Sequence, residues 1–428
     1  MSQLPRYESY KDSGVQWLGG IPSHWAVVRL DQGCEIVRGN TGFSKADLLE
    51  EGQYVALQYG KTYKVDEINN TFSSYVNEEF YKLSQIAMHG DTVLISTSET
   101  IEDLGHSCFY ARQDIGLIGG EQFLLKVNQG EKFGKYLYYL SKAFSGYLRK
   151  YATGTKVYRF NTDHLKKIYI PQIPFNEQKI IADFLDKRLA QVDALIAKQE
   201  TLLEKLAEQR VALISHAVTK GLNPDVEMKE SGVEWLGKVP RSWDIANLRY
   251  FISCNSGDAL ESSKILRDAD EFNYIPVIGG NGLLGFTENS NYKKECIAVG
   301  RVGALCGNVH FIDYESWIND NALLIKLISD KFNINYLVYL LRSRNLNELA
   351  SKTAQPLLTG TQVKAEKVCI PLMSEQLEIV RYLDTNLEAL DKLLETVNKT
   401  IQTLREYRST LITQVVTGKI DVRNLNVN

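Results

Sequence analysis

The chain has 428 residues, a net charge of −3, 44% hydrophobic and 24% charged residues, which is typical of a folded protein with two or three domains. No run of 18 apolar residues occurs and the first ten residues carry no apolar secretory core, so we expect no membrane span and no export. Six scattered cysteines without a Cys-x-x-Cys pair argue against a zinc knuckle and favour a reducing cytoplasm.

The basic residues are concentrated in two stretches. Residues 122–170 carry ten Lys or Arg against two acids, and residues 322–372 carry seven against three. A local basic stretch on an acidic chain attracts phosphate at short range. Any single lysine there can instead belong to a solvated helix face.

The chain opens with a motif that returns later. Residues 11–30 and residues 229–248 are identical at ten of twenty positions, including Trp25 against Trp243. Such agreement indicates an internal duplication, and repeats of this length define the architecture of a chain.

The middles of the two copies, residues 31–135 and 249–335, share little that can be aligned. Short β-rich runs such as residues 91–96 and 296–300 alternate there with Gly, Asn and Asp turns, which predicts strands. The G-x-G-x-x-G of residues 280–285 lacks a following helix, so we interpret it as a turn between strands and not as a dinucleotide site. Strands followed by helices predict an α+β class.

Each copy closes with a second match. Residues 136–171 align with residues 336–371 at an offset of 200, ending on Ile-Pro in both copies. We place a two-residue insertion after Pro171, because the offset is 198 from Glu177 onward, with fifteen identities in forty-three positions.

The segments that follow Pro171 and Pro371 each predict a helix of about 40 residues, roughly 60 Å long. Apolar residues spaced alternately three and four apart form a heptad seam that requires a partner helix. We expect the two helices to pair with each other as an antiparallel coiled coil in an internal pseudo-twofold repeat; docking of a foreign helix is the alternative. The seam consists of Ala182, Leu185, Leu189, Val192, Ile196, Gln199, Leu203, Leu206, Arg210 and Leu213, and of Val380, Leu383, Leu387, Leu390, Leu394, Val397, Ile401, Leu404, Arg408 and Leu411.

No catalytic constellation, phosphate-binding loop or metal spacing is recognisable, which favours a binding protein. The basic, aromatic end of each module is the candidate DNA contact, since Lys and Arg neutralise phosphates and polar side chains add phosphate or base-edge contacts. The candidates are Lys142, Arg149, Lys150, Thr153, Thr155, Lys156, Tyr158, Arg159, Arg301, Lys352, Gln355, Thr361 and Gln362.

The doubled opening motif Ser-Gly-Val-x-Trp-Leu-Gly, the Glu-Gln at the start of each long helix and the closing Leu-Ile-(Ser/Thr)-x-(Ala/Val)-Val-Thr resemble the specificity subunit of Type I restriction-modification systems. The resemblance implies two mixed α/β target-recognition domains, residues 1–175 and 222–373, and two helical spacers, residues 176–221 and 374–428. It also implies a chain without a catalytic site that binds double-stranded DNA, two methyltransferase subunits and restriction/translocase subunits. S-adenosylmethionine, ATP and magnesium are then expected on those partners and not on this chain.

Three alternatives remain open at this point. The first is a specificity partner of a fused restriction-methylation enzyme of Type II, which carries a similar resemblance. The second is a scaffold that binds protein and no DNA. The third is an enzyme such as a nuclease whose site has no recognisable motif.

Overall fold

The computed structural model describes residues 5–127, 133–303, 305–351 and 356–425. The chain divides into two compact units: residues 1–199 together with 399–428 form the first, and residues 200–398 form the second. Each unit therefore contains one module, the first half of one long helix and the second half of the other. This division differs from the four consecutive segments expected from the sequence.

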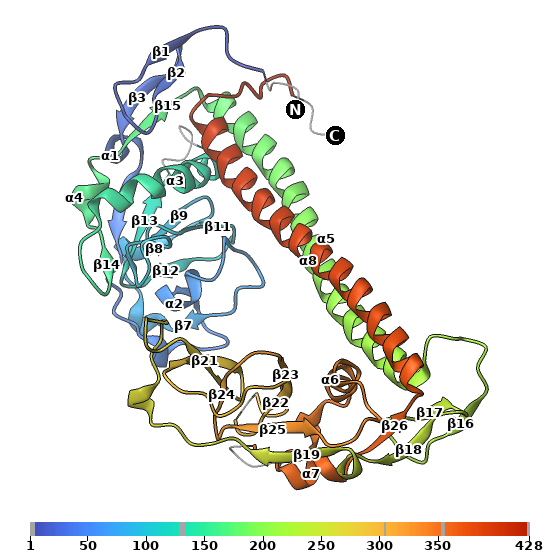
Figure 1. Cartoon of the computed structure of the whole chain (residues 1–428). Helices are drawn as coiled ribbons and strands as arrows, with labels where there is room; N and C mark the ends of the chain where they lie inside the picture. The colour runs from blue at the N-terminus through green and yellow to red at the C-terminus, as the bar shows by residue number, and fades with distance from the viewer. Residues whose placement is uncertain (1–4, 128–132, 304, 352–355, 426–428) are drawn as a thin grey trace. The chain divides into compact units, whose positions relative to one another are not determined.

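The first module is built on two sheets. Its larger sheet has the strand order β4-β13-β9-β11-β6 and its smaller sheet the order β7-β5-β12-β8, while helix α3 packs against β9 and β11 (Figure 1). The elements are β1 (Tyr10–Asp12), β2 (Gly20–Pro22), β3 (Ala26–Arg29), α1 (Leu30–Gly33), β4 (Glu35–Arg38), β5 (Tyr54–Leu57), α2 (Tyr59–Thr62), β6 (Glu67–Ile68), β7 (Tyr75–Val76), β8 (Ile86–Ala87), β9 (Thr92–Ile95), β10 (Thr97–Ser98), β11 (Ser107–Tyr110), β12 (Gly116–Ile118), β13 (Gln122–Lys126), α3 (Gly134–Leu148), β14 (Tyr158–Arg159), α4 (Thr162–Leu165) and β15 (Tyr169–Gln172).

The second module has sheets of order β19-β25-β22-β23 and β21-β20-β24. Its elements are β16 (Met228–Glu230), β17 (Lys238–Pro240), β18 (Asp244–Asn247), β19 (Ile252–Ser256), β20 (Ile275–Gly279), β21 (Gly282–Thr287), β22 (Cys296–Gly300), β23 (Val309–Ile312), β24 (Trp317–Ile318), β25 (Ala322–Leu327), α6 (Ile334–Ser343), α7 (Gly360–Ala365) and β26 (Lys367–Ile370). Gly280 and Asn281 connect the antiparallel strands β20 and β21, which confirms a turn there. Gly282 and Gly285 belong to β21, so the predicted turn over residues 280–285 is too long.

The unalignable middles of the two copies share one backbone frame. In the first module, the central strands β13 and β9 lie between β4 and β11; in the second, β25 and β22 lie between β19 and β23. The N–H of Ser96 donates to the carbonyl of Glu121 at 3.1 Å, and the N–H of Arg301 donates to the carbonyl of Asn321 at 3.0 Å. These two bonds occupy the same place in each frame, immediately before β13 and β25. The modules are therefore two versions of one fold.

A two-stranded sheet closes each module by joining its beginning to its end: β3 pairs with β15, and β18 with β26. The N–H of Leu30 donates to Ile168 and the N–H of Leu248 donates to Glu366, both at 2.8 Å. The residue numbers of the two equivalent donors differ by 218, and those of the two equivalent acceptors differ by 198. The two extra residues therefore precede β15, and the predicted insertion after Pro171 is wrong, because matching the two Ile-Pro pairs shifts the backbone register by two.

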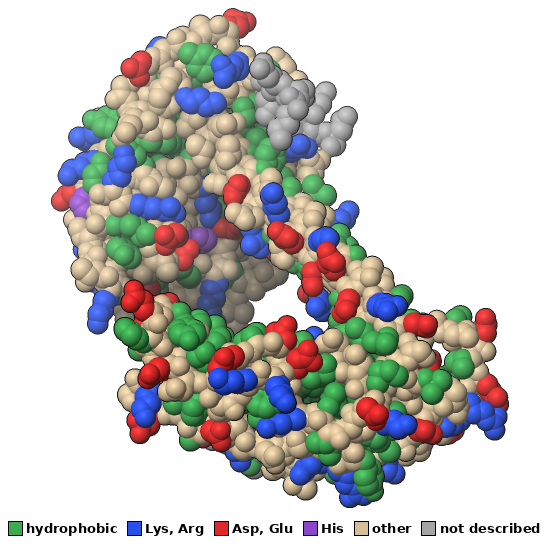
Figure 2. All heavy atoms as spheres, in the orientation of Figure 1, with side chains coloured by type: hydrophobic (Ala, Val, Ile, Leu, Met, Phe, Trp, Pro, Cys, Tyr) green, Lys and Arg blue, Asp and Glu red, His purple; other side chains and the backbone are tan. Residues whose placement is uncertain are grey.

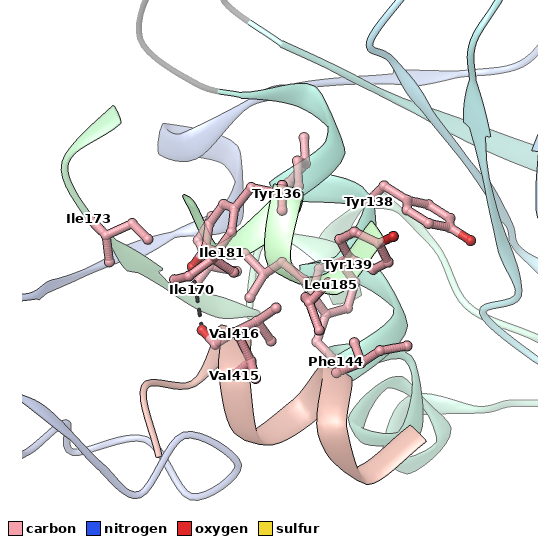
Figure 3. Close-up of a cluster of buried hydrophobic side chains, with 14 of the residues drawn as sticks. Tyr136, Tyr138, Tyr139, Phe144, Ile170, Ile173, Ile181, Leu185, Val415 and Val416 are labelled. Carbon is pink, nitrogen blue, oxygen red and sulfur yellow. Dashed lines mark hydrogen bonds between the residues drawn. The ribbon is translucent and has the colours of Figure 1, made fainter. Parts of the chain in front are cut away.

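The core of the first unit lies where its module meets the long helices. Side chains of α3 and β15 pack with Ile181, Leu185, Val415 and Val416 (Figure 3). The Tyr136 hydroxyl within this core donates to the carbonyl of Val416 at 3.4 Å. In the second unit Tyr336 donates in the same way to Val218 at 3.0 Å. The end of one long helix is thus part of the other copy's core.

The long helices are α5 (Phe175–Lys220) and α8 (Met373–Val416), which confirms both predicted helices. In the first unit Ile181 and Leu185 of α5 share a core with Val416 of α8, and Asp193 lies further along α5 beside Arg408, which precedes Val416 on α8. The two half-helices of this unit therefore run antiparallel. No helix in the described residues is long and apolar enough to cross a membrane.

The two arginines of the seam make equivalent ion pairs. Arg408 donates to Asp193 at 2.9 Å in the first unit, and Arg210 pairs with Asp391 in the second. All four residues are related by the offset of 198. Each seam arginine therefore holds a carboxylate of the opposite helix.

Candidate nucleic-acid interface

An exposed loop follows α3 in the first module. Two backbone hydrogen bonds close its second half: Thr153 N–H donates to the carbonyl of Arg159 at 3.0 Å, and Arg159 N–H donates to the carbonyl of Thr153 at 2.9 Å. Gly154 has φ +106°, and a Cβ there would lie 2.1 Å from the carbonyl oxygen of Val157, so only glycine closes the loop. The tip, Thr155 to Val157, is exposed. We call residues 149–159 the basic loop.

Four cations of the basic loop lie at the surface. Arg149 donates to the carbonyl of Glu102, and Lys150 lies 4.3 Å from the ring centroid of Tyr147. Lys156 is exposed at the tip, and the side chain of Arg159 is 61% exposed. Cations held this way on a short segment can contact successive phosphates. Figure 2 shows basic side chains interspersed with acidic ones on the visible face of both units, so net local charge alone does not outline an interface.

Lys142 has a different role from the one predicted. Its side chain is 16% exposed and its ammonium lies 2.6 Å from Asp66, which also pairs with Arg408 of α8 at 3.3 Å. Burial lowers the pKa of Lys142, and the Asp66 carboxylate opposes this effect. Burial likewise raises the pKa of Asp66, but the two cations outweigh it and the net pKa is lowered. Lys142 therefore binds the Asp66 carboxylate, which in turn joins the module to α8 through Arg408, and its ammonium is not available to phosphate.

The aromatic residues of the basic loop serve mainly as supports. Tyr151 stacks on His164 with ring centroids 5.3 Å apart, and Lys167 lies 5.9 Å from the Tyr151 ring. Tyr158 is half-buried on β14, where its partner across the ladder is Ser98. The rings thus fix the loop against α4 and β10, and leave the cations and threonines outward.

The candidates of the second module are less concentrated. Arg301 is half-buried at the end of β22 and donates to the Ser256 hydroxyl at 2.9 Å. Thr361 is exposed on α7. Lys352 and Gln355 lie outside the described residues.

Gln362 is occupied by a helix cap, contrary to prediction. Its Oε1 accepts from the Thr359 N–H at 2.8 Å and from the Thr359 hydroxyl at 2.7 Å. Its Nε2 donates to the carbonyl of Leu349 at 2.6 Å. This is the reciprocal arrangement of a capping box, so the amide of Gln362 holds α7 in place and is not free for a base edge.

Sequence reasoning missed Glu121 and Asn321, the residues that precede the central strands β13 and β25. Glu121 has φ +63°, one of two non-glycine residues with positive φ in the described part of the chain. Its side chain is 51% exposed and lies 4.0 Å from Arg159. Asn321 is exposed at the equivalent position. The preceding Gly119-Gly120 indicates a turn in the sequence, but only the tertiary structure shows that Glu121 lies beside Arg159.

Asp91 is a buried titratable group of the first module. Asp91 is 4% exposed; burial raises its pKa to about 6, although the N–H groups of Met88 and Val127 oppose the shift. Within the described residues no group of three or more His, Cys, Asp or Glu side chains could hold a metal ion.

Comparison with known proteins places these features in a family. The profile of the Type I restriction modification DNA specificity domain matches residues 22–205 and again residues 240–403. Each match begins in the opening motif of a copy and ends inside its long helix.

Two curated relatives also match most of the chain. The Type I restriction enzyme EcoprrI specificity subunit of Escherichia coli is 26% identical over 335 residues, which cover 75% of this chain and 79% of the relative. The MjaVIII specificity subunit of Methanocaldococcus jannaschii is 23% identical over 443 residues, which cover 97% and 98%.

Solved structures share the fold. A chain from a structure of complex assembly and conformational transition of the type I R-M system matches with a TM-score of 0.73 at 16% identity, covering 94% of this chain and 99% of that one. The HsdS subunit from Thermoanaerobacter tengcongensis matches with a TM-score of 0.54 at 16% identity, covering 94% and 98%. At this identity the likeness concerns the arrangement of the backbone.

Proposed function

The chain belongs to the family of Type I restriction-modification DNA specificity proteins, and from this premise we propose that it is the specificity subunit of a Type I complex. Its two modules read the two unlike halves of a split DNA target, and it carries no catalytic site of its own. One observation supports this most directly: the modules share a backbone frame and closing sheets, yet differ in the sequences of their loops. A common frame with different loops suits two different half-sites.

The long helices are the spacer in this proposal, paired over their whole length as an antiparallel coiled coil with pseudo-twofold symmetry. The equivalent pairs Arg408–Asp193 and Arg210–Asp391 support it, as does the burial of matching seam leucines, Leu185 and Leu383. Half-sites about one helical turn apart, near 34 Å, present their grooves on one face of the duplex. A stiff spacer also raises the effective concentration of the second module once the first is bound.

The proposed protein partners are two methyltransferase subunits and the restriction/translocase subunits. Equivalent exposed apolar residues on the two helices support two like docking surfaces: Leu195 and Leu393 are 47% and 43% exposed and are related by the offset of 198. S-adenosylmethionine, ATP and magnesium then act on the partners, which supply methyl transfer, translocation and cleavage. This chain would contribute position and sequence selection.

The test is a module exchange in the intact complex. The chain is co-produced with the methyltransferase subunit of a Type I system, and methylated adenines are mapped across a host genome. We expect methylation at a split, asymmetric site; replacing residues 249–335 with those of another family member should change one half of that site and leave the other half and the spacing intact. Loss of methylation in the unmodified complex, or a change in both halves, would contradict the proposal.

The same preparation separates the alternatives. A fused Type II partner would copurify as one polypeptide that both methylates and cleaves. A scaffold that binds only protein would give a stable complex without retention on duplex DNA. Cleavage of DNA by this chain alone with magnesium would indicate a nuclease instead.

A further inference from the structure

We propose that Glu121 is a base-reading residue of the first module: its carboxylate accepts a hydrogen bond from the exocyclic amino group of a cytosine or adenine in the major groove. Asn321 has the same task in the second module. This inference rests on the proposed function, because it names the residues through which the modules select sequence.

The backbone of Glu121 is held where a side chain is unfavourable. Its φ of +63° lies in the left-handed region, which disfavours residues with a Cβ and favours glycine. The two residues before it are glycines, so a third glycine would fit this turn at least as well. A residue with a Cβ that adopts a strained conformation at an exposed position points to a use for its side chain rather than for the fold.

The turn around Glu121 is rigid. Its carbonyl accepts the N–H of Ser96 at 3.1 Å. The next residue, Gln122, is 1% exposed; its Nε2 donates to Leu57 at 2.7 Å and its Oε1 accepts from the Thr62 hydroxyl at 2.7 Å. The carboxylate itself is oriented by the Thr97 hydroxyl. Because its backbone and its carboxylate are both held by hydrogen bonds, the Glu121 side chain is preorganised for a directional bond.

The charge of Glu121 indicates which part of DNA it contacts. It lies 4.0 Å from Arg159 and beside the basic loop, where phosphates are expected. A carboxylate repels phosphate, so at such a surface it weakens the affinity for DNA unless it faces a hydrogen-bond donor. Base edges provide such a donor: the amino groups of cytosine and adenine point into the major groove, and Glu and Asp are acceptors for the cytosine amino group.

The second module repeats this backbone hydrogen bond, without the positive φ, and has an amide side chain in place of the carboxylate. The carbonyl of Asn321 accepts the N–H of Arg301 at 3.0 Å, as Glu121 accepts that of Ser96. The Asn321 N–H donates to Oδ1 of the buried Asn319 at 2.9 Å. An exposed Asn beside an Arg can bind adenine through N6 and N7. Both modules thus present a short polar side chain from a fixed turn next to a cation.

The test uses the variant Glu121→Gly in the full chain bound to its methyltransferase subunit, with a pool of randomised DNA duplexes as the probe. Bound duplexes are sequenced for the wild type and the variant. We expect the variant to keep or raise the melting temperature, because glycine relieves the positive φ. At the same time its preference at one amino-bearing base pair in one half of the target should fall by about 5- to 150-fold. The base whose preference falls, cytosine or adenine, identifies the partner.

The matched control is Asn345→Gly, which replaces the other non-glycine residue with positive φ in the described residues, at φ +49°. The melting temperature of this variant should also hold or rise, and its DNA target should stay unchanged. Asn321→Ala should lose preference at a position in the other half. The inference is overturned if Glu121→Gly retains wild-type preference at every position. A wild-type complex that selects no target would overturn the proposed function itself, and this inference with it.

Discussion

Single polar residues in this protein have roles that depend on what surrounds them. Glu177 is buried and accepts hydrogen bonds from Tyr7 at 2.7 Å and from the Trp25 indole at 3.1 Å, and Glu375 accepts from Trp243 at 2.9 Å. A buried carboxylate without such donors would be costly. The Glu of the Glu-Gln pair at the start of each long helix, visible as a sequence match, therefore joins the helix to the second tryptophan of an opening motif.

The cations of the basic loop should determine the salt dependence of DNA binding. Replacing Arg149, Lys150, Lys156 and Arg159 by Ala should reduce the slope of log affinity against log salt by about 0.9 for each phosphate that is no longer neutralised, or about 3 to 4 for the four together. Fluorescence anisotropy with a labelled duplex at several salt concentrations measures this slope. The control is Lys142→Met, because the Lys142 ammonium binds Asp66. The salt-dependence slope of this variant should match that of the wild type. A smaller slope would contradict the assignment of Lys142 to the ion pair with Asp66.

Asp91 should make the first unit more stable at mildly acidic pH. Its folded pKa of about 6 exceeds the ordinary 3.8, so between these values the folded state holds a proton that the unfolded state has lost. Stability from this group therefore falls as pH rises through that window and is constant above it. Asp91→Asn cannot ionise, and relative to the wild type it should gain up to about 3 kcal/mol from pH 4 to pH 7. Urea unfolding across this range tests it.

Glu79→Gln is the control for Asp91, because it removes an exposed carboxylate of the same module. Its stability relative to the wild type should vary little over the same pH range. A parallel pH profile for Asp91→Asn and the wild type would show that Asp91 does not titrate as inferred.

At the scale of elements, the ends of the long helices are shaped by the opening motif of the other copy. Both helices end with a glycine in the left-handed conformation, Gly221 at φ +78° and Gly418 at φ +71°, which is a common helix terminus. The lysine next to each glycine then binds the opening motif: Lys220 donates to Leu236 at 2.8 Å and Lys419 donates to Leu18 at 2.7 Å. The lysine precedes the glycine in one copy and follows it in the other.

The two helix-terminal glycines should differ in their tolerance of a side chain. A Cβ on Gly418 would lie 2.4 Å from Pro22 and 2.8 Å from the Trp25 ring, whereas the nearest atom to a Cβ on Gly221 is on Trp243 at 3.2 Å. Both alanine variants incur about 1 kcal/mol for the positive φ. Gly418→Ala should be destabilised by a further 1–3 kcal/mol or so, roughly the cost of overpacking. Denaturant unfolding of the two variants side by side tests the order, and equal destabilisation would contradict it.

At the scale of the whole molecule, the first unit is discontinuous in sequence and the second is continuous. Residues 399–428 complete the first unit, and Leu411, Ile412, Val415 and Val416 are buried in its core. Residues 399–425 therefore fold with residues of the first module that are distant in sequence.

Removing residues 399–428 should unfold the first unit and spare the second. Each buried aliphatic side chain contributes about 1.5–3 kcal/mol, so removal of these four approaches the roughly 5–15 kcal/mol that stabilises a typical domain. Hydrogen exchange should then be fast in residues 10–170 and remain slow in residues 228–370. Restored protection on adding residues 399–428 as a peptide would support the mechanism, and undisturbed protection in the truncated chain would refute it.

The duplication, the two long helices and their heptad seam could all be predicted from the amino-acid sequence, because repeats, periodicity and helix-ending glycines are local patterns. The basic loop was also found in this way. Only the tertiary structure showed that Lys142 pairs with Asp66, because the two residues are distant in sequence. It also showed that Gln362 caps α7, because that role depends on where the helix begins. The tertiary structure likewise corrected the register of the Ile-Pro match and showed that the unalignable middles share one fold, because strand pairing specifies burial and backbone bonds while leaving loop residues such as Glu121 and Asn321 free to differ.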